Sequence, residues 1–148
     1  MSPTDLADTH VRIELWVWPD RDALDDRRDL VLRRLERLQE SGVVNEVDVH
    51  EWSHQINLDS AADVDPEDLP ARTRLMEFTE WARHRGVSLP IPDPTRAGSG
   101  RLGPEYVAQD MPRMMLAEYR DGELDCVAPH RADGEKHTIE DHLKTLGE

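Results

Sequence analysis

Residues 50–54, HEWSH, match the H-E-x-x-H pattern of zinc proteases. On a helix, His50 and His54 would share a face and bind one zinc ion, with Glu51 as general base. The preceding residues, VVNEVDV, are typical of a strand instead. On a strand the two histidines lie roughly 13 Å apart, at ~3.3 Å per residue, which is too far to share an ion. A zinc-dependent hydrolase is therefore only a second, less favoured alternative.

Four further histidines, His84, His130, His137 and His142, lie in polar segments. His137 and His142 flank the start of the last predicted helix, and a metal cluster that includes His130 is one alternative. The favoured interpretation places these histidines on the solvated surface. We accordingly assign no metal site, no cofactor and no catalytic residue from the sequence.

Cys126 is the single cysteine, so it cannot form an internal disulfide. It falls in a predicted hairpin strand, where a free cysteine usually behaves as a small buried apolar residue. We expect that role for Cys126 in preference to a reactive thiol. Chemistry of the thiol–disulfide type also needs a low-pKa thiolate and usually a second thiol.

Two of the four tryptophans follow strands that we expect to be adjacent and parallel. Trp18 and Trp52 would then lie at the carboxyl edge of the sheet, where α/β proteins bind ligands. The irregular segment 88–104 could cover this edge. The residues expected at this ligand- or partner-binding edge are Trp18, Asp20, Arg21, Trp52, Met111 and Pro112.

Hydrophobic periodicity places these side chains on predicted elements. Residues 11–18 alternate as a strand covered on both faces, residues 21–41 form an amphipathic helix, and residues 43–52 form a second strand. A strand, a helix and a strand make a βαβ unit. Another helix is expected to begin near Pro66 or Pro70 and to end at Gly86.

The last third of the chain predicts a hairpin and a helix. MPRMMLAEYRDGELDCVAP reads as two strands joined by an Asp121-Gly122 turn. HTIEDHLKTLGE is typical of a short helix, with Thr138 and Asp141 spaced as a capping box. The predicted order is β-α-β-α-loop-β-β-α, within one domain over residues 10–148 that follows a polar tail over residues 1–9.

This order, together with MPRMMLAEYRDGELDCVAPHRADGEKHTIEDHLKTL, resembles the thioredoxin-like fold. The resemblance implies an α/β fold with a central mixed sheet, and a cis proline at Pro112. The family's C-x-x-C motif is missing, because WPDRDALDD stands after the first strand. The favoured function is therefore a non-redox binding or regulatory adaptor for a protein or small ligand. A homodimer is one option for its assembly, and enzyme activity is not favoured.

The helix over residues 21–41 carries an alternative function, DNA binding by a transcription regulator. VLRRLERLQESGVV resembles the junction of a recognition helix and a wing, and its arginines could contact phosphates. In the favoured interpretation, those arginines instead pair with acidic residues of the same helix, namely Asp29, Glu36 and Glu40. Nucleic acid is thus a possible but not a favoured partner.

The whole chain is similar to a family of haloarchaeal proteins often labelled helix-turn-helix domain proteins. The shared segments are VRIELWVW, RLERLQESGVV, VDVHEW, LDS, FTEWARHRGVSL and MLAEYRDGEL. This resemblance implies no catalytic residues.

Composition favours an extreme halophile as the source. The chain has 32 acidic and 18 basic residues, a net charge of −14, and only two lysines, Lys136 and Lys144. An acidic surface stays hydrated in concentrated salt, where its self-repulsion is screened. With neither a signal peptide nor a transmembrane segment in the sequence, we expect a cytoplasmic protein without a membrane partner.

Overall fold

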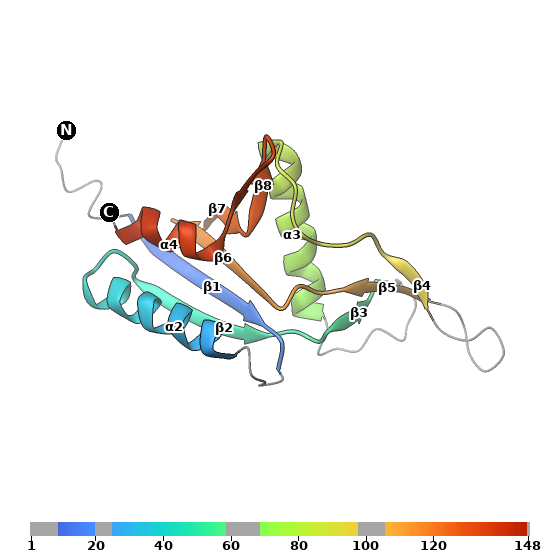
Figure 1. The fold of residues 1–148 in the computed structure, drawn as a ribbon, viewed down its shortest axis with the longest axis horizontal. Coiled ribbons are helices and arrows are strands. Elements are labelled where there is room, and N and C mark those ends of the chain that lie inside the picture. Colours follow the sequence, from blue (N-terminus) through green and yellow to red (C-terminus); the bar gives the residue numbers. More distant parts are fainter. Residues whose placement is uncertain (1–8, 20–24, 59–68, 98–105, 148) are drawn as a thin grey trace.

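The structure is a computed structural model that describes residues 9–19, 25–58, 69–97 and 106–147 (Figure 1). A mixed four-stranded sheet has the order β2-β1-β6-β7. Its strands are β1 (Val11–Val17), β2 (Glu46–Glu51), β6 (Met114–Arg120) and β7 (Glu123–Ala128). The helices in the described part of the chain are α2 (Asp25–Glu40), α3 (Leu69–Arg85) and α4 (Ile139–Gly147). None of these helices has the length and apolar character needed to cross a membrane.

The predicted βαβ unit is confirmed. Strands β1 and β2 run parallel, with Ile13 beside Val47, and α2 connects them. Helix α2 ends at Glu40, and Gly42 follows with a φ of 84°, a left-handed conformation that glycine adopts without steric cost. Strand β2 is an outer strand of the sheet.

Both faces of the sheet are covered, as the alternation along β1 predicted. Ile13 and Leu15 point toward α2 and α4 and pack in one buried cluster with Leu143. Trp16 points to the opposite face and packs in a second cluster with Phe78 of α3. Figure 1 shows α2 and α4 on one side of the sheet and α3 on the other. The fold is thus mixed α/β, with two helix layers around one sheet.

The predicted hairpin is confirmed as β6 and β7. Its turn residues, Asp121 and Gly122, have φ values of 51° and 84°, the two left-handed positions of a type I′ turn. Cys126 on β7 pairs in register with Glu118 on β6. Because paired residues of neighbouring strands project from the same face, these two side chains share the face that α4 covers.

Two small sheets were not predicted. One has the order β3-β5-β4 and extends away from the main sheet, and the other is the hairpin β8-β9 (Figure 1). Their strands are β3 (Gln55–Asn57), β4 (Thr95–Ala97), β5 (Tyr106–Asp110), β8 (His130–Ala132) and β9 (Glu135–His137). The described part of segment 88–104 therefore contains a paired strand where the sequence predicted only irregular chain.

The expected cis peptide at Pro112 is wrong. The cis bond in the described part of the chain is Ala128–Pro129. The residue before Pro112 is held by a backbone hydrogen bond. The Met111 N–H donates to the His54 carbonyl at 2.8 Å.

Candidate functional site: a cysteine–histidine cluster

The beginning of α4 is fixed by the predicted capping box. The Asp141 N–H donates to Thr138 Oγ1 at 3.0 Å, and the Thr138 N–H donates to Asp141 Oδ2 at 3.1 Å. Thr138 is therefore the N-cap, His137 precedes it, and His142 is the fourth helical residue. The side chains at these two flanking positions normally meet as a hydrophobic staple. Here both positions carry histidine.

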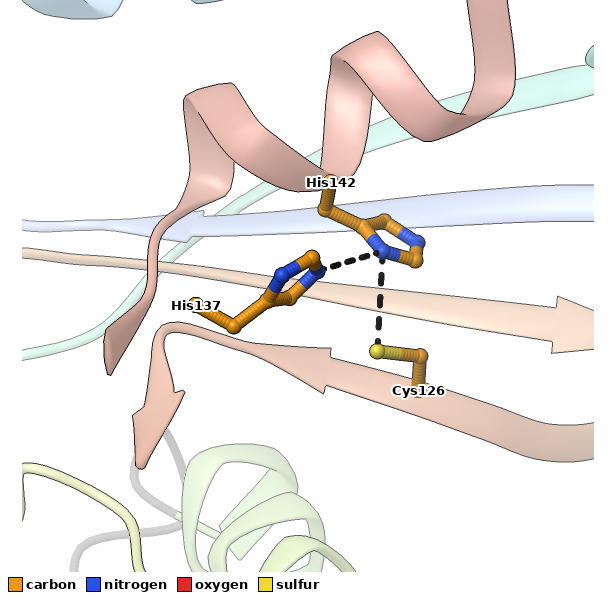
Figure 2. Close-up of side chains that lie close together, drawn as sticks. All are labelled: Cys126, His137 and His142. Carbon is orange, nitrogen blue, oxygen red and sulfur yellow. Dashed lines mark hydrogen bonds between the residues drawn. The ribbon is translucent and has the colours of Figure 1, made fainter. Parts of the chain in front are cut away.

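These two histidines and Cys126 converge on one point (Figure 2). His137 Nε2 lies 3.2 Å from His142 Nδ1, and Cys126 Sγ lies 3.6 Å from the same His142 nitrogen. His142 is buried, whereas Cys126 and His137 are half-buried. Three elements thus bring together two imidazoles and one thiol: β7, the end of β9 and the first turn of α4.

Glu118 holds the other nitrogen of His142. His142 Nε2 donates to Glu118 Oε1 at 2.6 Å, and the second carboxylate oxygen contacts the Arg120 guanidinium. Glu118 is 1% exposed, so these contacts compensate a carboxylate that is removed from water. The result is an orienting carboxylate behind His142.

The protonation of the cluster follows from these contacts. Burial opposes a charge on His142, but hydrogen bonds with Cys126 and Glu118 outweigh burial and raise its pKa to about 9. Burial lowers the pKa of His137, and the neighbouring imidazoles of His130 and His142 lower it further. Burial would raise the pKa of Glu118, but its hydrogen bond from His142 lowers it.

This arrangement permits two kinds of chemistry. A thiol, an imidazole and a carboxylate in sequence form a nucleophile, a base and an orienting group. Two imidazoles and a thiol that face one point can instead bind a metal ion. The second imidazole, His137, has no part in the first scheme, whereas the second scheme uses it directly.

The sequence interpretation of these residues needs correction. His137 and His142 were placed on the solvated surface, yet they face Cys126 below α4. Cys126 was expected to be an inert buried residue and is half-buried beside His142. The sequence does contain a signal for this pair. The capping box of Thr138 and Asp141 has a histidine directly before it and another directly after it, at two positions whose side chains normally meet.

The HEWSH motif forms no metal site among the described residues. His50 is the penultimate residue of β2 and stacks on Trp16, with ring centroids 4.7 Å apart. His54 lies after the strand and packs on Trp18 at 4.1 Å. The two histidines therefore contact different tryptophans, as expected for residues on extended chain and not on one helix turn.

The predicted edge residues do come together in part. The Trp18 indole N–H donates to the Met111 carbonyl at 3.0 Å, and the Trp52 indole N–H donates to the Pro112 carbonyl at 2.8 Å. Asp20 and Arg21 lie outside the described residues. The indole donors are thus occupied by the backbone, and a ligand-binding role for this edge stays a prediction.

The segment 88–104 was expected to cover that edge, and this stays a prediction; its described part lines a groove with α3. Residues 87–94 and α3 line a groove of about 570 Å³, in which Leu75, Met76 and Ile91 contribute apolar surface. A second cavity of about 320 Å³ lies beside the cluster and is lined by His130 and Lys136. The His130 ring lies 4.9 Å from the His137 ring, so this second cavity adjoins the cysteine–histidine cluster.

The surface between α2 and α4 gathers positive charge. Arg34 and Arg37 of α2 and Lys144 of α4 line a shallow groove of about 310 Å³. At the other end of the two helices, an ion pair joins Arg27 of α2 to Glu140 of α4, with N···O distances of 2.7 and 3.0 Å. We name the three cations Arg34, Arg37 and Lys144 the basic groove.

The three helices in the described part of the chain are each separated in sequence by at least one strand. Among these residues, no helix therefore follows another through a short turn. No curated protein and no solved structure matches the chain. A family model described as a helix-turn-helix domain matches residues 5–148, so the chain belongs to that helix-turn-helix family.

Proposed function

We propose that the protein is a DNA-binding regulator. The family match over residues 5–148 carries this proposal, because helix-turn-helix domains characteristically bind DNA. The adaptor function favoured by the sequence has no support from the comparisons. The regulator, which the sequence left as the alternative, has the better support.

The basic groove is the surface that we assign to DNA contact. The chain has a net charge of −14, so three neighbouring cations form a locally positive surface on an acidic protein. Such a surface attracts phosphate oxygens. Arg33, on the same helix and next to Arg34 in the sequence, is exposed but does not line the groove. Contacts of this kind orient a protein on the duplex but do not read its sequence.

The absence of competing ion pairs supports this assignment. The sequence suggested that the arginines of α2 pair with Asp29, Glu36 and Glu40. Within the described residues, none of these pairs forms with Arg34 or Arg37. Arg27 is different, because Glu140 binds its guanidinium. Among the described residues the groove cations form no ion pair within 4 Å, although the charges of Arg34 and Lys144 reach Glu140 and Asp141, where they add to the hydrogen bonds that lower the pKa values of those carboxyls.

A fluorescence-anisotropy titration with mixed genomic DNA fragments tests the proposal. Binding is measured from about 0.2 M to about 2 M potassium chloride, because each phosphate contact contributes about 0.9 to the salt slope of the binding constant. We expect saturable binding, and a slope that falls by up to about 2.7 in the Arg34→Ala, Arg37→Ala, Lys144→Ala variant.

The matched control removes three exposed arginines elsewhere, through Arg83→Ala, Arg85→Ala and Arg131→Ala. Both triple variants change the net charge equally, so only the position of the lost charges differs. No saturable binding by the parent protein would rule out the function. An equal slope change in both variants would rule out the groove.

For the fold, we propose a thioredoxin-like arrangement. A parallel β1–β2 pair joined by α2, followed by antiparallel β6 and β7 and by α4, supports it. The trans bond before Pro112 departs from that family's pattern. An experimental structure with a different strand order would contradict this proposal.

A further inference from the structure

We propose that Cys126, His137 and His142 bind one divalent transition-metal ion of the zinc type. Their ligand atoms, Sγ, Nε2 and Nδ1, all lie within 4.8 Å of one another. Figure 2 shows the thiol and both rings turned toward the same point. The site is separate from the basic groove and goes beyond the proposed function.

The spacing of the ligand atoms matches a tetrahedral ion. Zn–S bonds of about 2.3 Å and Zn–N bonds of about 2.0–2.1 Å, at the tetrahedral angle, place sulfur and nitrogen about 3.6 Å apart and two nitrogens about 3.4 Å apart. In the structure, Cys126 Sγ and His142 Nδ1 are 3.6 Å apart, and the nitrogens of His137 and His142 are 3.2 Å apart. Two of the ligand-to-ligand distances that a tetrahedral ion requires are therefore already present without the ion.

Glu118 completes the arrangement behind the ligand. Histidines that bind metal usually donate their other ring N–H to a carboxylate, which fixes the tautomer and the ring orientation. Glu118 accepts this bond from His142 Nε2 at 2.6 Å, so a metal ion that displaces the proton from Nδ1 would meet a nitrogen that already faces Cys126 and His137.

The fourth coordination position is open to water or to a further side chain. The ring of His130 lies 4.9 Å from that of His137, at the cavity of about 320 Å³ beside the cluster. The three ligand residues do not line this cavity themselves, but Cys126 and His137 are only half-buried and are therefore partly accessible from solvent.

The test is a titration of the full chain with Co²⁺, after removal of bound metal by a chelator. A thiolate ligand gives Co²⁺ a charge-transfer band in the near ultraviolet, and tetrahedral coordination gives strong visible bands. We expect both, at one equivalent, and displacement by one equivalent of Zn²⁺. Zn²⁺ should also raise the midpoint of thermal unfolding, because it binds only the folded state tightly.

Variants locate the ion. Cys126→Ser should abolish the charge-transfer band, and His137→Gln should weaken Co²⁺ binding. Glu118→Gln, a change at a positioning residue, should weaken it about 10–100-fold. His84→Gln is the matched control, because that exposed histidine lies on α3, away from the cluster, and pairs with Glu80. Circular dichroism checks that each variant folds.

Several results would overturn the proposal. One is a folded parent protein that binds Co²⁺ without a charge-transfer band or not at all. Another is a folded Cys126→Ser variant that retains the band. Rapid alkylation of Cys126 at the same rate with and without Zn²⁺ would assign the thiol to nucleophilic chemistry instead. If Cys126→Ser does not fold, the stoichiometry, bands and Zn²⁺-dependent midpoint of the parent protein decide alone.

Discussion

At the scale of single residues, the strongest set of electrostatic contacts outside the cysteine–histidine cluster is the one around Glu14. This carboxylate lies on β1, is 1% exposed and faces α3. It accepts two bonds from Arg74, at 2.8 and 2.9 Å, and one from the Trp16 indole at 3.0 Å. Arg12 contacts it as well. Glu14 therefore ties α3 to the centre of the sheet.

Replacing Glu14 by Gln should lower the free energy of unfolding by about 3 kcal/mol, because a buried ion pair loses one partner. Urea unfolding in concentrated salt measures it. The matched control is Glu77→Gln, which removes a half-buried carboxylate from the same Arg74 and should cost less than about 1 kcal/mol. Equal losses in the two variants would contradict a special role for Glu14.

Glu14 also predicts a pH dependence. Burial would raise its pKa, but the bonds from Arg74, Arg12 and Trp16 outweigh burial and hold the pKa below the ordinary value of 4.5. The stabilisation is therefore complete above pH 4.5 and is lost as pH falls through the folded-state pKa. Unfolding free energies of the parent and Glu14→Gln should converge below that pH. Parallel curves would argue against the mechanism.

At the scale of elements, periodicity predicted the main sheet and its helices because each presents a repeating apolar face. It missed β3, β4, β8 and β9, which have three residues each and are too short to show alternation, and it also missed the five-residue strand β5. These strands depend on partners supplied by tertiary structure. The cluster was missed for a related reason: Cys126 and His142 are 16 positions apart and meet only when α4 packs on β7.

The cap of α4 should influence both stability and metal affinity. Thr138→Ala removes the side chain that receives the Asp141 N–H, at a cost of about 1 kcal/mol. It should also weaken Co²⁺ binding, because the cap holds His137 and His142 together. Thr145→Ala on the same helix is the control and should change stability by less than about 0.5 kcal/mol. Unchanged Co²⁺ affinity in Thr138→Ala would show that the ion itself organises this turn.

At the scale of the whole molecule, the net charge of −14 controls stability. Self-repulsion among 32 acidic residues opposes the folded state until salt shortens the screening length to about 3 Å at 1 M. The midpoint of thermal unfolding should therefore rise between about 0.2 M and about 2 M potassium chloride. Sodium chloride should act equally, since screening depends on ionic strength. A midpoint that is unchanged or falls would contradict this account.

The outer strand β2 gives the acidic surface a further consequence. Glu46, Asp48 and Glu51 are exposed along it, and within the part of the chain that the structure describes its far side in the sheet has no neighbouring strand. Strand edges of this kind invite a second chain to continue the sheet, and like charges oppose that continuation. In dilute buffer the acidic edge acts as a barrier to sheet-to-sheet growth of aggregates. Concentrated salt stabilises the folded state, but it also screens the repulsion between acidic edges of neighbouring molecules. The same salt therefore favours fibre formation.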